Sequence, residues 1–295
     1  MDKRIGILLA GGTGSRLLPL TATVNKHFLP VFDKPMINYS LSLLMLGGIS
    51  NIVVVCRDQD LHSFQAYLGD GSHLGLTLSF AIQTSTLGIP DAMLAATRAF
   101  GYPVTVVLGD NFLAGGNLRQ VLIERNKNLD ECQIFTCRVN QPEKFGVVSR
   151  NSNREIDRIL EKPSNPSSDE AVVGLYNFPE DWFERCQMLE PSARGELEIV
   201  DLINSYLVEG GLVCTEFGRG YSWLDMGSPE TLFTASSFVE TTQRVQGRPI
   251  GLLPEISIAN GWISRFDLLE MAKLPMFRAF RSYLTKLGDE YDAKR

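Results

Sequence analysis

The chain has 295 residues, of which 44% are hydrophobic, and its formal net charge is −6. This length allows one large core, or one main domain with a smaller appendage. The negative charge and the lack of a basic run argue against a nucleic-acid partner, and no apolar segment is long enough to span a membrane.

The five cysteines have neither paired metal-ligand spacing nor a small disulfide scaffold around them. We therefore expect free thiols in a reducing cytoplasm, and no secretory signal opens the chain. The three histidines are scattered along the sequence, which argues against a histidine-based metal cluster or catalytic triad.

Short apolar runs rich in β-branched residues alternate with helix-like segments up to about residue 215. The expected strands cover residues 4–10, 51–56, 76–83, 103–110 and 132–139. The expected helices cover residues 36–49 and 89–101. This alternation is typical of a mostly parallel sheet with helices on both faces. No strand is expected between residues 10 and 51.

The pattern changes after residue 140. Two strand-like runs within residues 145–163 flank the polar turn RNSNRE, which predicts a hairpin laid on the core. Residues 229–246 and 265–287 look helical. We predict a Rossmann-like α/β fold with an inserted hairpin and a C-terminal helical appendage. The expected division is a core over residues 1–230 and a helical, oligomerisation segment over residues 231–295.

The segment LLAGGTGSRLLPL, residues 8–20, joins the first strand to a glycine-rich turn. Such a turn places successive backbone N–H groups around an anion, and phosphate is the usual ligand. The Gly-Lys-Ser/Thr ending of a P-loop is missing. A dinucleotide-binding loop would continue as a helix, but Pro19 interrupts it, and the strand that follows ends in Cys56 rather than an acid. A simple tight turn also fits the loop.

Two aspartates follow apolar strand-like runs. Asp110 ends one such run, at the sheet edge where α/β proteins usually bind ligands. Asp225 follows Tyr-Ser-Trp in another. Two carboxylates brought together from distant strands make a hard oxygen site that suits Mg²⁺. Taken alone, either residue fits a turn or helix cap equally well.

Further motifs follow the glycine loop in order: NKHFLP (25–30), LGDN (108–111), EKP (161–163), ARGELEIVDLIN (193–204) and GYSWLDMGS (220–228). Together they resemble the sugar-phosphate nucleotidylyltransferases, within that family the thymidylyltransferases, from residue 4 to about residue 285. The resemblance implies that a sugar 1-phosphate attacks a nucleoside triphosphate and pyrophosphate is released, with Mg²⁺ as cofactor. Glucose 1-phosphate and dTTP are the expected substrates and dTDP-glucose the expected product. Such a reaction requires positioning and charge neutralisation more than a covalent nucleophile.

The resemblance also assigns roles to individual residues. The triphosphate would lie on Gly11, Gly12 and Gly14, and the base at Gln83 and Gly88. The catalytic cations would be Arg16, Lys26 and Lys162. Arg16 would stabilise the departing pyrophosphate, although an isolated arginine also fits a solvated surface. Mg²⁺ would be held by Asp110 and Asp225.

The same resemblance predicts the sugar-phosphate site. Its expected members are Asn111, Gly146, Glu161, Lys162, Val172, Arg194 and Trp223. Glu161 would accept hydrogen bonds from sugar hydroxyls, while Lys162 and Arg194 would bind the sugar phosphate. For Trp223 a plain role in the core fits as well. Without the resemblance, the charges at residues 194–198 would indicate an exposed helix start.

The chain departs from the family pattern at two places. Pro90 and Asp91 stand where the thymidylyltransferases usually have Ala and Gln. We interpret this pair as a recapped helix start, the alternative being a changed nucleotide or sugar preference. Ala259 stands where many relatives have arginine, and AGGNL where they have Gly-His. These changes predict feedback inhibition that is weakened or directed at a different sugar.

Three alternatives to the expected activity stay open. The same chemistry would fit UTP or another sugar or pseudo-sugar phosphate. A non-catalytic regulator that binds sugar nucleotides would be expected to lack one of the charged residues. A nicotinamide-dependent oxidoreductase is poorly supported by the loop. The expected partners are dTTP, a sugar 1-phosphate and other copies of the chain in a homotetramer, with the C-terminal helices as an assembly surface.

Overall fold

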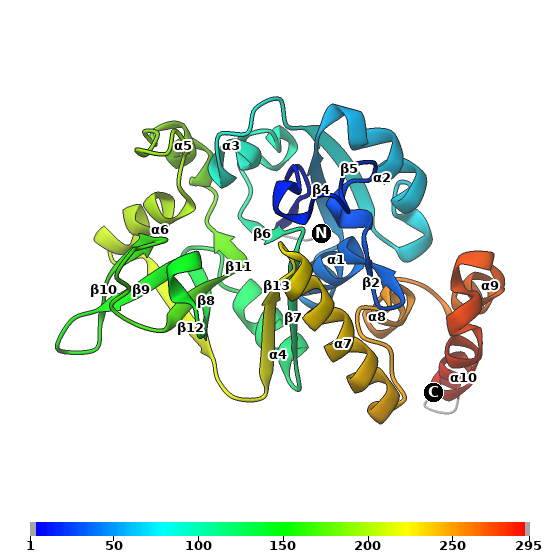
Figure 1. Cartoon of the computed structure of the whole chain (residues 1–295). Coiled ribbons are helices and arrows are strands. Elements are labelled where there is room, and N and C mark those ends of the chain that lie inside the picture. The colour runs from blue at the N-terminus through cyan, green and yellow to red at the C-terminus, as the bar shows by residue number, and fades with distance from the viewer. Residues whose placement is uncertain (1–3, 293–295) are drawn as a thin grey trace.

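The computed structural model describes residues 4–292, and within them nine strands form one main sheet (Figure 1). The expected core and C-terminal segment include residues 1–3 and 293–295, which lie outside the described part of the chain. The sheet order is β10-β9-β11-β6-β1-β4-β5, with β8 beside β11 and β12 beside β8. The nine strands are β1 (Ile5–Leu9), β4 (Asn51–Cys56), β5 (Thr77–Ile82), β6 (Val104–Leu108), β8 (Cys132–Arg138), β9 (Gly146–Arg150), β10 (Ile156–Glu161), β11 (Glu170–Phe178) and β12 (Leu212–Phe217).

The sheet is parallel where the sequence pattern alternates most regularly. Strands β5, β4, β1 and β6 are all parallel to their neighbours within this half of the sheet. The long strand β11 then runs antiparallel to β6, β8 and β9. The expected strands and the hairpin β9–β10 are present, so the predicted α/β class is confirmed. Strands β11 and β12 were not predicted, and they make the second half of the sheet mixed.

Two small ladders lie outside the main sheet. They pair β2 (Pro30–Val31) with β3 (Lys34–Pro35), and β7 (Asn111–Gly115) with β13 (Tyr221–Asp225). The expectation of no strand between residues 10 and 51 is therefore wrong. Two residues per strand are too few to produce a recognisable alternation of side chains. The β7–β13 ladder carries part of the candidate site.

Helices cover both faces of the sheet. They are α1 (Met36–Leu46), α2 (Leu61–Leu68), α3 (Ile89–Leu94), α4 (Leu118–Asn126), α5 (Trp182–Gln187), α6 (Ile199–Val208), α7 (Pro229–Gln246), α8 (Leu253–Ala259), α9 (Arg265–Lys273) and α10 (Arg281–Asp292). Strand β1 is buried on both sides: Ile7 contributes to the apolar cluster that contains α3, α5 and α6, and Leu8 to the one that contains α1, α2 and α8. Such double burial explains why the strands read as continuous apolar runs.

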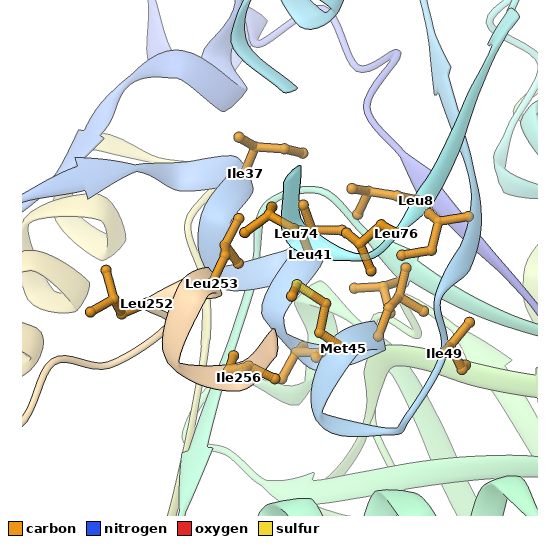
Figure 2. Close-up of a cluster of buried hydrophobic side chains, with 14 of the residues drawn as sticks. Leu8, Ile37, Leu41, Met45, Ile49, Leu74, Leu76, Leu252, Leu253 and Ile256 are labelled. Carbon is orange, nitrogen blue, oxygen red and sulfur yellow. The ribbon is translucent and has the colours of Figure 1, made fainter. Parts of the chain in front are cut away.

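Figure 2 shows the second of these clusters, where α1 lies between the sheet and the C-terminal part of the chain. Leu41 and Met45 of α1 are fully buried. Leu253 and Ile256 of α8 approach α1 from the side away from Leu8. Because α1 is buried at every position from Met36 to Met45, it is an internal helix, and α8 covers one side of it.

Two predicted helices are interrupted. The segment 265–287 is broken because Leu274 is extended, with φ −65° and ψ 144°, before Pro275. Proline disfavours the helical conformation of the residue that precedes it. The segment 89–101 contains α3 and then a separate 3₁₀ turn at Thr97–Ala99. Helices α9 and α10 lie at the end of the molecule opposite the hairpin β9–β10 (Figure 1).

Candidate active site

The glycine loop follows β1 and leads into a short 3₁₀ helix at Ser15–Leu17. Gly14 has a φ of +69°, in the left-handed region that favours glycine. At Gly11 the constraint is space, because a Cβ atom there would lie 2.1 Å from Oε1 of Gln83. The loop is therefore shaped to let another group approach its backbone, and Gln83 already lies against it.

Lys26 and Asp110 form a close ion pair beside the loop. Nζ of Lys26 lies 2.5 Å from Oδ2 of Asp110, and both side chains are largely buried. Burial alone would raise the pKa of Asp110, but the charge and hydrogen bond of Lys26 outweigh it and lower that pKa to about 2. Asp110 is thus a carboxylate at neutral pH.

A buried polar network supports the turn that carries Lys26. The Asn25 side chain accepts a hydrogen bond from the backbone N–H of His27 and lies 2.7 Å from its Nδ1. Asn25 also donates to Asp60, which accepts from Arg57 as well. Burial is the main reason that the pKa of His27 is lowered to about 3, and the charge of Lys26 contributes in the same direction. This imidazole is therefore neutral. The network fixes the backbone on both sides of Lys26.

The β7–β13 ladder brings Asp110 and Asp225 together. Asn111 pairs with Asp225 in this ladder, and the backbone N–H of Met226 donates to the carbonyl of Asp110 at 2.9 Å. Burial and the charge of Asp110 raise the pKa of Asp225. Arg16 opposes this shift from 3.8 Å away. Two neighbouring carboxylates of this kind favour a bound cation.

These residues fit a divalent metal of the magnesium type. Asp110 and Asp225 supply hard oxygen donors, and the mutual repulsion of their charges would be relieved by a cation. Across residues 4–292, no group of three or more His, Cys, Asp or Glu side chains could hold a metal. Mg²⁺ commonly takes only one or two protein carboxylates and completes its shell with water and substrate phosphates.

The other charged cluster lies at the end of β10. Nζ of Lys162 lies 2.9 Å from Oε1 of Glu161. Lys162 has a φ of +42°, which is uncommon for a residue with a side chain and is often found at functional sites. Arg194 contacts Glu198 at 2.7 Å and Glu161 at 3.4 Å. Each cation is thus held by carboxylates that an anionic ligand would replace.

Trp223 forms one wall of this region. Its indole N–H donates to Oδ1 of Asn111, and its ring lies 4.9 Å from that of Phe145, measured between centroids. The side-chain amide nitrogen of Asn111 is buried and has no hydrogen-bond partner within the described residues. A buried donor without a partner is costly, so a ligand oxygen at this point would complete the site.

Two adjoining cavities contain nearly all the residues predicted from the sequence. The first, of about 480 Å³, is lined by Arg16, Asp110, Asn111, Gly146, Glu161, Lys162, Val172, Arg194, Trp223 and Asp225. The second, of about 340 Å³, is lined by Gly11, Gly12, Lys26, Gln83 and Gly88. Asp110, Glu161, Lys162 and Arg194 line both. Gly14 lines neither and shapes the loop instead.

The structure also places residues in the cavities that sequence reasoning missed. Lys144, Phe145 and Tyr176 line the first cavity, and Thr86 and Glu198 the second. Lys144 directly precedes the segment 145–163 in which the hairpin was predicted, and Phe145 is its first residue. Their position next to the hairpin was the signal that could have identified them. Tyr176 belongs to β11, which shifts its register against β8 between Val172 and Tyr176. Such irregularities commonly redirect side chains next to active sites.

Comparison with known proteins places the chain in a family. The model of the nucleotidyl transferase family matches residues 5–242, which is most of the chain. The chain belongs to the nucleotidyl transferase family. A glucose-1-phosphate thymidylyltransferase of Neisseria meningitidis is 44% identical over 283 residues, covering 96% of this chain and 98% of that protein. One of Xanthomonas campestris is 40% identical over 290 residues, covering 98% of each chain.

Solved structures of nucleotidyl transferases share the fold. A candidate glucose-1-phosphate thymidylyltransferase of Bacillus anthracis, in complex with sucrose, is 35% identical with a TM-score of 0.73. The match covers 79% of this chain and 94% of that one. A UDP-glucose pyrophosphorylase complexed with UDP-glucose has a TM-score of 0.70 at 23% identity, covering 81% and 99%. At that identity the likeness concerns the fold alone. In residues 4–292 no helix is long and apolar enough to cross a membrane.

Proposed function

We propose that this nucleotidyl transferase family member joins the thymidylyl group of dTTP to glucose 1-phosphate, giving dTDP-glucose and pyrophosphate. The observation that carries the proposal is the pair of adjoining cavities. One opens on the glycine loop and the other on the hairpin, and both contain Asp110, Lys162 and Arg194. Two phosphorylated substrates can therefore meet at one cluster of charges.

The reaction follows from this arrangement. The triphosphate lies on the glycine loop beside Lys26 and Arg16, while the sugar phosphate takes Lys162 and Arg194 from their carboxylate partners. An oxygen of the sugar phosphate then attacks the α-phosphorus in line, and the bond to the departing pyrophosphate breaks. Carboxylate partners hold these cations at the cavities before the substrates bind, so positive charge is already present where negative charge develops. Arg16 stabilises the charge that accumulates on pyrophosphate, because its guanidinium can contact two oxygens at once.

Magnesium is part of the proposal. Asp110 and Asp225 would hold Mg²⁺, which when bound neutralises phosphate charge and helps to orient the triphosphate. Lys26 keeps Asp110 ionised and available as an oxygen donor. Asn111 and Trp223 supply the polar atom and the wall of the sugar pocket, and Glu161 accepts hydrogen bonds from sugar hydroxyls.

The proposal extends to the assembly of the protein and its cellular compartment. Large apolar side chains on the C-terminal helices are exposed, among them Phe233 and Val245 of α7 and Phe266 of α9. Such exposure supports assembly of several copies, here a homotetramer. All five cysteines are free, which fits a reducing cytoplasm. In this proposal residues 1–230 form the catalytic core, and residues 231–295 form the helical segment through which copies assemble.

The experiment that tests the proposed function is pyrophosphate release with glucose 1-phosphate and Mg²⁺, run in parallel with dTTP, UTP, CTP, ATP and GTP. We expect turnover with dTTP to exceed that with CTP and the purine nucleotides. Formation of dTDP-glucose should match pyrophosphate release mole for mole. Turnover confined to another nucleotide, or none with glucose 1-phosphate, would refute the assigned substrates.

A further inference from the structure

Asp91 holds the loop that forms one wall of the nucleotide cavity. This loop, residues 83–88, connects β5 to α3, and its Gln83, Thr86 and Gly88 line the cavity. Both carboxylate oxygens of Asp91 accept from the hydroxyl of Ser85, at 2.7 and 2.8 Å. One of them also accepts from the backbone N–H of Leu87 at 3.4 Å. One side chain in the first turn of α3 thus fixes the middle of the loop.

Asp91 also reaches the residue at the start of the loop. The side-chain nitrogen of Gln83 donates to Oδ2 of Asp91 at 3.4 Å. An ionised carboxylate only accepts hydrogen bonds, so the NH₂ half of the Gln83 amide must face it. The carbonyl half then points the other way, and Oε1 lies against Gly11. Asp91 therefore determines which half of this amide faces the glycine loop.

We propose that Asp91 is a positioning residue that makes Gln83 present a hydrogen-bond acceptor to the base of the nucleotide. The inference rests on the proposed function, because it takes the cavity beside the glycine loop as the base site. Thymine and uracil carry an N–H at ring position 3 that can donate to Oε1 of Gln83. In cytosine the ring nitrogen at position 3 carries no hydrogen. Two hydrogen-bond acceptors, this nitrogen and Oε1 of Gln83, would then face each other. Asp91 thus selects nucleotides with an imide N–H.

The variant Asp91→Asn separates this role from a simple helix cap. Asparagine has the same shape and can still accept from Ser85, but its NH₂ group can donate to Oε1 of Gln83. The glutamine is then free to turn and to present its own NH₂ group to the base. We expect affinity for dTTP and dUTP to fall about tenfold, the effect of one hydrogen bond. Affinity for dCTP should stay the same or rise.

The measurement is calorimetric titration of the full-length protein with dTTP, dUTP and dCTP, together with steady-state kinetics. Because dUTP lacks the 5-methyl group but keeps the N–H, it distinguishes loss of the hydrogen bond from loss of methyl contacts. In the kinetics, KM for dTTP should rise while kcat changes little. Asp289→Asn, an exposed residue of α10 paired with Arg265, is the matched control and should leave the affinities unchanged.

A second variant keeps the test decisive if Asp91→Asn folds poorly. Ser85→Ala leaves Asp91 in place but removes its shortest hydrogen bonds, and we expect a smaller loss of dTTP selectivity in the same direction. Unchanged ratios of dTTP to dCTP affinity in correctly folded variants would overturn the inference. If the wild-type protein binds dTTP selectively but forms no dTDP-glucose, the proposed function fails while the binding result still tests the role of Asp91.

Discussion

Replacing Arg16 by alanine is expected to lower kcat about 10²- to 10³-fold, the usual cost of removing one preorganised group that stabilises transition-state charge. The guanidinium lies at the edge of the first cavity, 3.8 Å from Asp225, and its side chain is 66% exposed. Because such an exposed ion pair adds little stability, the unfolding temperature should barely change. Steady-state kinetics and thermal unfolding on the same preparation measure both effects.

Two further variants identify the property of Arg16 that matters. Arg16→Lys keeps the charge but loses the two-pronged contact, so it should recover only part of kcat. Arg98→Ala removes an exposed arginine that lines neither cavity and should behave like the wild type. A wild-type kcat in Arg16→Ala would remove this residue from the reaction and with it our account of pyrophosphate departure.

Asp225→Asn is expected to raise the Mg²⁺ concentration needed for half-maximal activity by about 10- to 100-fold, as the loss of one charged ligand interaction would. Asparagine keeps the shape of the side chain but has no negative charge. Activity measured across a magnesium titration gives this shift directly. Asp169→Asn, an exposed aspartate paired with Arg138, serves as the matched control. An unchanged titration curve would exclude Asp225 as a metal ligand.

The same variant should stabilise the protein without metal. Burial and the nearby charge of Asp110 raise the pKa of Asp225, so ionising this group costs the folded state more than the unfolded one. A carboxyl with a raised pKa reduces stability at pH values above its unfolded pKa, which includes neutral pH. The neutral amide introduced by Asp225→Asn removes this cost. We expect a higher unfolding temperature in EDTA at pH 7 and a smaller gain on adding Mg²⁺ than in the wild type.

Features encoded by local sequence were predictable. The first strand and its glycine turn, the hairpin within residues 145–163 and the early alternation of strands and helices all produce short-range patterns. The C-terminal half of the sheet was harder. Strand β11 is buried at all nine positions, as β1 is at all five, but its apolar run is interrupted by Gly174 and Asn177. Its place between β6, β8 and β9 depends on pairings between segments far apart in the chain.

In the candidate site, too, local sequence identified some features while others depend on distant contacts. The motifs supplied the charged residues, but their arrangement depends on tertiary structure. The β7–β13 ladder sets Asn111 opposite Asp225. Strand β7 was not predicted, and the strand-like run before Asp225 gave no indication of its partner. The positive φ of Lys162 is likewise imposed by its surroundings rather than by its residue type. The interpretation of Pro90 and Asp91 as a helix start fits α3, yet the contacts of Asp91 with Ser85 and Gln83 appear only in the folded loop.

In the proposed reaction both substrates occupy the adjoining cavities together, and the sugar phosphate attacks the α-phosphorus directly. Among the described residues that line them, none is Cys, His or Ser. The most direct test is exchange of radiolabelled pyrophosphate into dTTP, with Mg²⁺ and without any sugar phosphate. We predict no exchange under these conditions, and exchange once glucose 1-phosphate is added. Exchange without sugar phosphate would show a covalent nucleotidyl-enzyme and would contradict direct attack.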